Sequence, residues 1–283
     1  AVLWMLGATL LFVMMHGAIR NLAGGLDPFE IVFFRNVFGL LFLAPVFIRY
    51  GLQPLRTSQF KLHFWRAVIN FANMVAIYFG LSLTPLAEVT ALNFTAPLFA
   101  AILATMFLGE TLRLRRTLAL VVGFAGAILV LRPGIEAINP GALFVLFAAV
   151  LWGGIMIFIK VLARKDSSLT ITTWVMVLMT AMSLPPTLFV WQTPTPEQFG
   201  WLAFIAVTGT IGQLMLAQAL KEADATSLMP IDFFRLIWAA IIGYFAFGEI
   251  PDIYTWSGGI MIFAAATYVA FREKKLHSQG DSR

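Results

Sequence analysis

Two residues of opposite charge lie inside an apolar stretch near the end of the sequence. Asp232 and Arg235 belong to the run 227–249, in which the only other charged residue is Glu249 at its end. Residues three positions apart share one face of a helix and can pair. Such a pair could receive a zwitterion, with Asp232 toward an ammonium group and Arg235 toward a carboxylate, which the planar guanidinium binds through two N–H groups. The alternative is a self-neutralising pair that fixes the helix against its neighbours.

The composition indicates that the chain is surrounded by lipid. Its 283 residues are 60% hydrophobic and 12% charged, whereas a soluble domain typically carries about 25% charged residues. The run 142–159 contains no charged residue, and about 20 predominantly apolar residues span a bilayer. Cysteine is absent, which excludes disulfides, thiolate metal sites and cysteine nucleophiles.

Apolar runs separated by Gly, Pro and charged residues predict ten transmembrane helices in an all-α integral membrane protein. The fifth run is the shortest. Pairs of glycines in the fifth and tenth runs (Gly123 and Gly126, Gly258 and Gly259) predict close helix packing there. The ten ranges are 2–20, 28–48, 63–82, 86–108, 115–131, 141–160, 169–191, 199–220, 225–247 and 254–271.

The lysines and arginines of the loops predict the orientation of the chain. Fifteen lie in one set of loops and the C-terminal tail, and two, Arg20 and Arg132, lie in the opposite set. Cytoplasmic loops carry the excess of basic residues, so both termini are expected in the cytoplasm. Topology therefore explains the net charge of +5, and no nucleic-acid partner is expected. The fifteen are Arg49, Arg56, Lys61, Arg66, Arg113, Arg115, Arg116, Lys160, Arg164, Lys165, Lys221, Arg272, Lys274, Lys275 and Arg283.

The two halves of the sequence contain matching residues in the same order. Each half holds five predicted helices, and this odd number turns the second copy upside down in the membrane. We expect inverted five-helix repeats at 1–138 and 139–272, followed by a cytoplasmic tail at 273–283. An offset of 139 pairs Gly109-Glu110 with Gly248-Glu249 and Asn93-Phe94 with Asp232-Phe233, and an offset of 140 pairs Phe12 with Trp152, Arg20 with Lys160 and Pro45 with Pro185.

The ten helices, the two repeats and the Gly-Glu pair that closes the fourth helix of each repeat (FLGE, 107–110; FGE, 247–249) resemble the drug/metabolite transporter superfamily, EamA type. The resemblance implies a secondary transporter that exports small organic metabolites, such as amino acids, across the bacterial inner membrane by alternating access. The branch that exports aromatic amino acids fits best. The sequence departs from the family pattern at Asp232 and Arg235, where mostly neutral residues are usual.

Other functions remain as alternatives. A multidrug, nucleoside or vitamin carrier of the same fold is the first. An intramembrane lipid-modifying enzyme is less favoured, because the predicted helices contain one histidine away from their ends, His16, and no cysteine. We expect no catalytic residue, no metal site and no cofactor. The expected partners are a small-molecule substrate and the lipid bilayer, with the monomer as the functional unit.

Polar and aromatic residues inside the predicted helices are candidates for contact with the substrate. For the amides the alternative is an interhelical hydrogen bond, for the histidine it is packing, and for the tryptophans it is anchoring at the membrane interface. The candidates are Asp232, Arg235, Trp238, Asn73, Tyr78, Asn93, Trp152, Gln213 and His16.

Four further residues are candidates for gating or coupling. Arg35 is expected to pair with Glu30 or Glu88, or to extend to the interface. Glu88 could couple transport to protons, and its alternative is an ion pair near the surface. Pro97 and Pro230 interrupt helix hydrogen bonds inside predicted spans, a feature common at transport sites and also tolerated as a simple kink.

Overall fold

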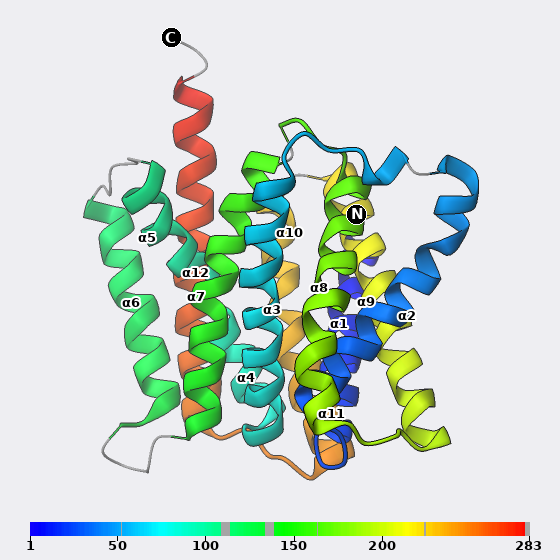
Figure 1. Cartoon of the computed structure of the whole chain (residues 1–283). Helices are drawn as coiled ribbons and strands as arrows, with labels where there is room; N and C mark the ends of the chain where they lie inside the picture. Colours follow the sequence, from blue (N-terminus) through cyan, green and yellow to red (C-terminus); the bar gives the residue numbers. More distant parts are fainter. Residues whose placement is uncertain (52, 109–113, 134–138, 163, 224, 281–283) are drawn as a thin grey trace.

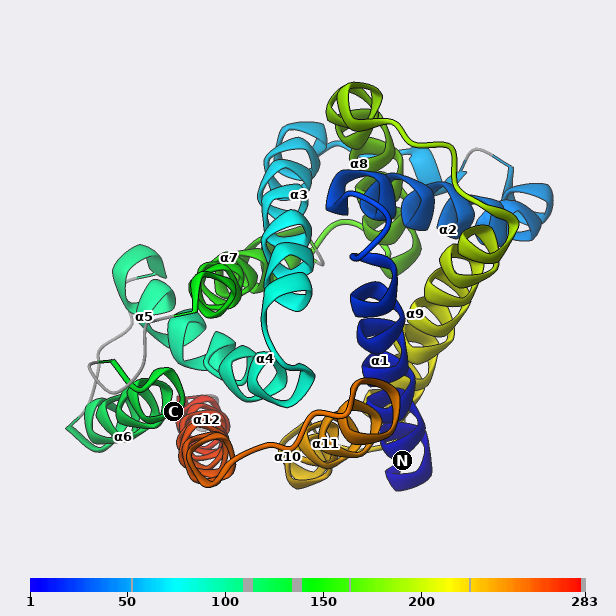
Figure 2. The same ribbon diagram turned by 90° about the horizontal axis from the view of Figure 1, so that it is seen from below.

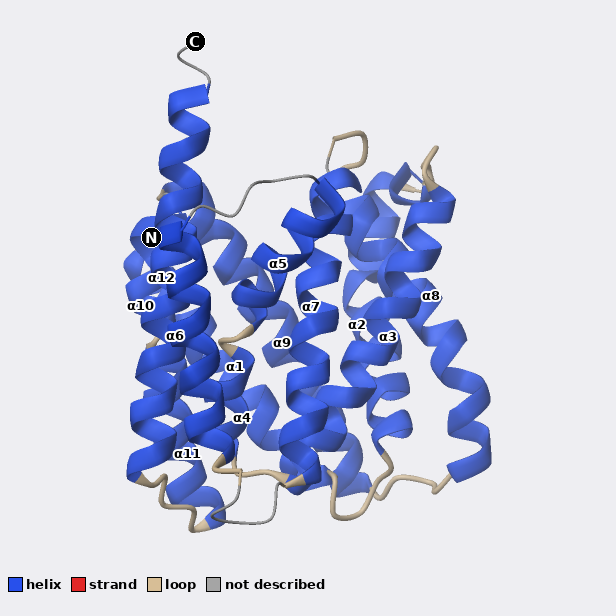
Figure 3. Cartoon of the chain, turned by 90° about the vertical axis from the view of Figure 1, so that its left-hand side faces the viewer, coloured by secondary structure: helices blue, strands red, loops and turns tan. Residues whose placement is uncertain are grey.

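The computed structural model describes residues 1–51, 53–108, 114–133, 139–162, 164–223 and 225–280. Every regular element in these ranges is a helix (Figure 3), which confirms the all-α architecture. Gly109-Glu110, the sequence equivalents of Gly248-Glu249, lie outside the described residues, as does residue 138 at the expected boundary between the repeats.

Each half of the chain forms five spans, and the fourth span of each half is divided into two helices. The first half comprises α1 (Val2–Leu22), α2 (Pro28–Tyr50), η1 (Gln53–Leu55), α3 (Phe60–Leu83), α4 (Leu86–Asn93) with α5 (Ala96–Leu108), and α6 (Leu114–Leu131). The second comprises α7 (Pro140–Leu162), α8 (Ser168–Val190), α9 (Pro196–Glu222), α10 (Ala225–Asp232) with α11 (Phe234–Phe247), and α12 (Ile253–Gly280).

The described helices have the length and composition of transmembrane segments. Nine spans are long and apolar enough to cross a membrane, when α4 with α5 and α10 with α11 are each taken as one. The remaining span is α6, the fifth along the chain. It is apolar over Thr117–Leu131, and its 18 residues extend about 27 Å at 1.5 Å per residue. The ten-helix membrane fold is thus as expected. The last helix is longer than expected, because α12 continues through most of the expected tail to Gly280.

Local sequence signals place the helix starts at equivalent points of the two halves. Asp27 caps α2 by accepting a hydrogen bond from the Phe29 N–H at 2.9 Å, and Pro28 occupies the first turn, where its missing N–H costs nothing. Ser167, which is 140 residues later, caps α8 through the Thr170 N–H at 3.1 Å. The second and seventh spans therefore begin at repeat-related residues.

The two divided spans break at positions related by the 139-residue offset. Phe94 follows α4 and Phe233 precedes α11, and both keep helical backbone angles. At each break an N–H bonds three residues back, Thr95 to the Leu92 carbonyl at 3.0 Å and Leu236 to the Phe233 carbonyl at 2.9 Å. Each break is therefore a tightened turn that bends the span without unwinding it.

The two breaks lie against each other in the structure. The rings of Phe94 and Phe233 stack with centroids 6.4 Å apart, and Phe263 of α12 packs at 5.4 Å from the first ring and 4.9 Å from the second. This contact joins the two repeats at residues that the sequence repeat makes equivalent.

The helices are grouped in pairs drawn from both halves. Close partners include α1 with α9, α3 with α7, and α2 with α8. Viewed along the bundle in Figure 2, α6 and α12 lie side by side at one edge and α2 and α8 at another. We call the end of the bundle that carries Arg20 and Glu249 the Arg20 end, and the end that carries Thr57 and Asp166 the Asp166 end; α12 extends beyond the latter (Figure 1).

Glycines allow α6 and α12 to approach closely, as the sequence predicts. A Cβ added to Gly126 would lie 2.8 Å from the Gly258 carbonyl oxygen, and one added to Gly258 would lie 2.6 Å from the Gly126 carbonyl oxygen. The backbones are therefore in direct contact, as in the small-residue interfaces of membrane helices.

We predict opposite effects of alanine at two glycines. Gly258→Ala should destabilise the purified protein by about 1–3 kcal/mol, because the added methyl group collides with backbone. Gly154→Ala on α7 meets no atom within 4 Å, so it should stabilise by about 0.5–1 kcal/mol through the better helix propensity of alanine. Thermal unfolding of both variants in detergent measures the effects, and equal stability of the two would contradict the backbone contact.

The orientation of the bundle is predicted from its basic loops and can be read by labelling, since the chain lacks cysteine. Gly24→Cys at the Arg20 end and Ser58→Cys at the Asp166 end both place the thiol at exposed positions. An impermeant thiol reagent added outside intact cells should label Gly24→Cys and spare Ser58→Cys. The reverse pattern would place the termini outside the cell.

Candidate substrate-binding site

The charged pair sits at the break of the ninth span. Asp232 ends α10 and Arg235 begins the first turn of α11, and Asp232 Oδ1 lies 2.7 Å from Arg235 Nε. This contact is an ion pair without the alignment of a good hydrogen bond, since neither atom has a hydrogen-bond partner among the described residues. Both side chains are 26% exposed, so each retains surface for a further ligand.

Aromatic side chains lie beside the pair on two helices. The Arg235 guanidinium carbon lies 5.1 Å from the ring centre of Phe12 on α1, a cation–π contact. Trp238 follows Arg235 by one turn of α11, and its indole N–H is buried without a partner among the described residues. The pair is thus bordered by apolar rings and by an unused donor.

Two more candidate residues extend the site from α11 to α2. His16 lies one turn along α1 from Phe12, where the charges of both Arg235 and Arg35 act on it. Arg35 approaches α3, with Nη1 at 3.5 Å from Met74 Sδ, and α9, where a Cβ on Gly209 would lie 3.6 Å from its Nη2. The site therefore spans helices of both repeats.

Arg35 has no acidic partner among the described residues. The expected pair with Glu30 is wrong, because Glu30 accepts hydrogen bonds from the backbone N–H groups of Asp27 at 3.3 Å and Gln192 at 2.7 Å. The Glu30 carboxylate is therefore part of the N-terminal cap of α2. The Arg35 Nε atom is buried without a hydrogen-bond partner in the described part of the chain.

Tyr78 completes this side of the site. It lies on α3 one turn after Met74, is 2% exposed, and its hydroxyl has no partner among the described residues. Met74, one turn earlier on α3, is the residue that Arg35 Nη1 approaches at 3.5 Å. Two unused donors, a guanidinium and a phenol, therefore lie together inside the bundle.

Among the described residues, the remaining candidates make no hydrogen bond or ion pair with the charged pair, and their assignment stays a prediction. The Asn73 amide donates to the Ala148 carbonyl at 2.7 Å and so ties α3 to α7. Asn93 is half-buried at the end of α4, whereas Trp152 is 40% exposed on α7 and Gln213 is exposed on α9.

The gating candidates fall at the breaks and at one end of the bundle. Pro97 is the second residue of α5 and Pro230 lies inside α10, two residues before Asp232; both are exposed. Glu88 lies in the first turn of α4 and lines a cleft at the Arg20 end together with Arg132 and Glu249.

An ionic cluster, which sequence reasoning missed, closes the Arg20 end. The Arg20 guanidinium on α1 pairs with Glu249, which follows α11, and donates to the carbonyl oxygens of Leu81 and Thr84 at the end of α3. The other Glu249 oxygen accepts the Leu86 N–H of α4 at 2.8 Å. This Arg20–Glu249 latch joins both repeats across the bundle.

The two ends of the bundle are packed differently. At the Arg20 end, α1 packs against α3 and α4. The repeat-related helices of the second half, α7 against α9 and α10, make no comparable contact within the described residues. The contact is thus made at the Arg20 end, and no comparable symmetry-related contact is made at the Asp166 end within the described residues.

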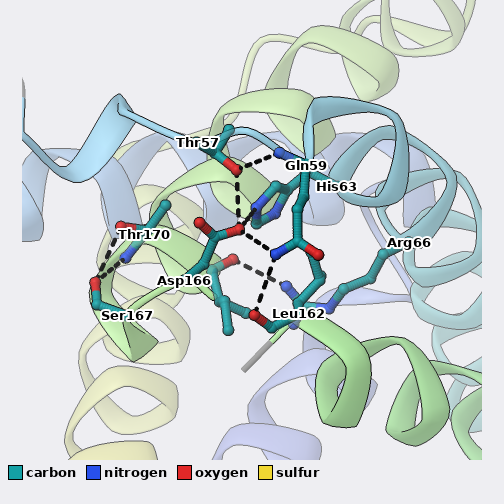
Figure 4. A network of polar contacts seen from close by, with 9 residues as sticks. Thr57, Gln59, His63, Arg66, Leu162, Asp166, Ser167 and Thr170 are labelled. Atoms are coloured by element: carbon teal, nitrogen blue, oxygen red, sulfur yellow. Dashed lines mark hydrogen bonds and ion pairs between the residues drawn. The ribbon is translucent and has the colours of Figure 1, made fainter. Parts of the chain in front are cut away.

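A polar face of α3 fixes this helix to the second repeat. Arg66 donates to the Ile171 carbonyl at 2.9 Å and Asn70 to Met179 Sδ at 2.8 Å, on the same face as Asn73. At the Asp166 end His63 Nε2 lies 2.9 Å from Asp166 Oδ2 (Figure 4). Membrane helices commonly associate through such buried polar contacts.

Asp166 is the centre of that terminal network. Its Oδ2 also accepts hydrogen bonds from Thr57 at 2.9 Å and Gln59 at 3.1 Å (Figure 4). Burial raises the pKa of Asp166, but the hydrogen bonds from His63, Thr57 and Gln59 outweigh it and hold the pKa below its usual value. The network thus stabilises the contact between α3 and the α7–α8 loop at neutral pH, and acidification through the lowered pKa removes it.

Comparison with known proteins identifies the family. Residues 1–132 and 139–271 each match the EamA-like transporter family. The chain belongs to this family. It is a multi-pass membrane transporter rather than an enzyme.

Relatives within the EamA-like family carry specific names. An S-adenosylmethionine uptake transporter of Rickettsia bellii is 32% identical over 92% of this chain and 89% of the relative. A riboflavin transporter of Brucella anthropi is 30% identical over 87% of this chain and 88% of the relative. A solved crystal structure matches with a TM-score of 0.64 over 96% of this chain and 97% of that one at 16% identity, which shows a shared fold.

Proposed function

We propose that this EamA-like protein is a secondary transporter for small organic solutes that carry an amino-acid head group and an apolar or aromatic body. The observation that carries the proposal is the Asp232–Arg235 pair, held at 2.7 Å inside a transmembrane span with both side chains partly exposed. The pair offers a carboxylate to an ammonium group and a guanidinium to a carboxylate.

The surroundings of the pair support an aromatic body. Phe12 lies against Arg235, and Trp238 offers a ring face and an unused N–H one turn away. Aromatic side chains bind flat rings by stacking and by edge contacts. S-adenosylmethionine, named for relatives that are 32% identical, combines an amino-acid head with an aromatic ring, and aromatic amino acids have the same two parts.

Riboflavin is the second candidate solute, because relatives at 30% identity are named for its transport. Riboflavin has a flat ring but no amino-acid head. A riboflavin carrier would need the rings beside the pair more than the pair itself. The two candidates are therefore separated by variants that remove the charges.

We propose alternating access between the Arg20 end and the Asp166 end, which in our proposed orientation face the outside and the cytoplasm. The latch joins helices of both repeats at the first end, while the repeat-related helices at the second end make no comparable contact within the described residues. Inverted repeats exchange these two arrangements by rocking around the site. The family resemblance favours export, whereas relatives are named as uptake transporters. In a carrier of this kind the direction of transport is set by the gradients of the solute and of any coupled ion.

Neutralising the charged pair tests the solute class. Asp232→Asn and Arg235→Gln should each lower stability more than the double change, because a single change leaves one charge uncompensated in the bundle, commonly at a cost of about 3–5 kcal/mol when fully buried. The partial exposure of both side chains reduces that cost. Thermal unfolding gives the stabilities, and uptake into proteoliposomes gives the transport of phenylalanine, S-adenosylmethionine and riboflavin.

The double variant distinguishes a substrate-binding pair from a purely structural one. It should be stable, inactive toward the two amino-acid solutes, and unaffected toward riboflavin if wild type carries it. Recovery of amino-acid transport in the double variant would make the pair purely structural, and full activity in both single variants would contradict any role of the charges.

Breaking the latch tests alternating access. Glu249→Gln should weaken closure of the Arg20 end and shift the population toward the state open there. A reporter Ile242→Cys on α11, beside Gly17 of α1, should then react with an external impermeant thiol reagent about fivefold faster or more, as for a shift of 1 kcal/mol or more.

The control for this experiment is Asp252→Asn in the same reporter background. Asp252 lies at the same end but pairs with Arg132 at 2.6 Å instead of Arg20. Equal reaction rates in the two variants would show that Glu249 holds no closed state.

A further inference from the structure

The described ionisable side chains of the site do not balance in charge. Arg35 and Arg235 each contribute a positive charge, and Asp232 contributes the one carboxylate in ion-pair contact with either of them among the described residues. Arg235 is paired and Arg35 is not. The positive charge in excess therefore resides on Arg35, inside a transmembrane bundle where a charge without a partner is unfavourable.

The surroundings of Arg35 contain donors and soft apolar groups. Its Nη1 is placed against Met74 Sδ at 3.5 Å, a weak acceptor. The hydroxyl of Tyr78, one turn along α3, is buried without a partner among the described residues, and Tyr78 is 2% exposed. A buried hydroxyl and a buried guanidinium nitrogen normally have acceptors, so this part of the site lacks an acceptor with negative charge.

We propose that Arg35 and Tyr78 form a second subsite that binds a carboxylate of the transported solute, distinct from the Asp232–Arg235 pair. The inference rests on the proposed function, in which the Asp232–Arg235 pair binds the amino-acid head of the solute. The second subsite then binds a carboxylate at the other end of the same solute. A neutral acceptor would satisfy the hydroxyl but leave the charge of Arg35 uncompensated. The preferred solute thus carries one negative charge more than a plain zwitterion such as phenylalanine, and S-adenosylmethionine, whose sulfonium adds a positive charge, should bind less tightly than such a solute.

Arg35 on α2 and Met15 on α1 both lie against Gly209 of α9, whereas Arg235 on α11 lies against Phe12 of α1. A solute that contacts both arginines must therefore reach from α11 to α2. The two subsites therefore select for the separation of the two charged ends as well as for charge, which makes Arg35 and Tyr78 determinants of specificity.

The test compares two ligands of nearly equal size that differ in charge, 4-carboxyphenylalanine and 4-carbamoylphenylalanine. Their binding to the detergent-purified protein is measured by the ligand-dependent rise in Tm. Wild type should bind the acid about tenfold more tightly than the amide, as for a charge-assisted contact. Arg35→Gln should bind both equally, Arg35→Lys should retain a preference for the acid, and Tyr78→Phe should lose part of it.

Matched controls remove similar groups elsewhere. Arg56→Gln removes one positive charge from an exposed position, and Tyr244→Phe removes a hydroxyl from a residue that is 55% exposed on α11. Both should keep the wild-type preference for the acid. Without ligand, Arg35→Gln should unfold at the same or a higher temperature than wild type, because it removes a charge that no described protein group compensates; a structural arginine would give a lower Tm.

The outcomes separate this inference from the proposed function. Equal binding of acid and amide by wild type, or an undiminished preference in Arg35→Gln, would overturn the second subsite while binding of the amide still supports an amino-acid carrier. Failure of both ligands to raise the Tm of wild type would overturn the proposed function, and the second subsite with it.

Discussion

Asp232 and Arg235 are held together because a charge inside a lipid-embedded bundle needs a partner. An arginine at the centre of a membrane helix costs about 2.5–3.5 kcal/mol or more, and contact at 2.7 Å between opposite charges offsets part of this cost. The tight turn at Phe233 places the two residues on either side of a break and keeps them on one face. The ring of Phe12 lies against Arg235, and Trp238 follows Arg235 by one turn of α11.

The inverted repeat gives this site two possible routes of access. Repeat-related breaks meet at Phe94 and Phe233, which places the symmetry contact close to the charged pair. At the Arg20 end the latch ties α1, the α3–α4 junction and the end of α11. The equivalent helices of the second repeat make no comparable contact within the described residues, and this asymmetry is what the proposed alternating access expects of one of its two states.

Long apolar runs and paired Gly-Glu motifs were sufficient to predict ten helices, the repeat and the family, because hydrophobic length and loop charge are local properties of the sequence. Long-range partners were not predictable in this way. Arg20 and Glu249 meet only because α1 packs against α11. Glu30 was predicted to pair with Arg35, but its carboxylate instead caps the N-terminus of α2. Asn73 lies in a transmembrane span as expected, but its amide donates a hydrogen bond to α7.

Counterflow in proteoliposomes tests the central claim, that this EamA-like protein is a carrier whose site includes the charged pair. Vesicles loaded with unlabelled solute are diluted into a trace of labelled phenylalanine or S-adenosylmethionine. The account predicts a transient accumulation of label above equilibrium for at least one of these solutes with wild type, and none with the stable Asp232→Asn/Arg235→Gln double variant. Monotonic equilibration without accumulation, or accumulation unchanged in the double variant, would contradict it.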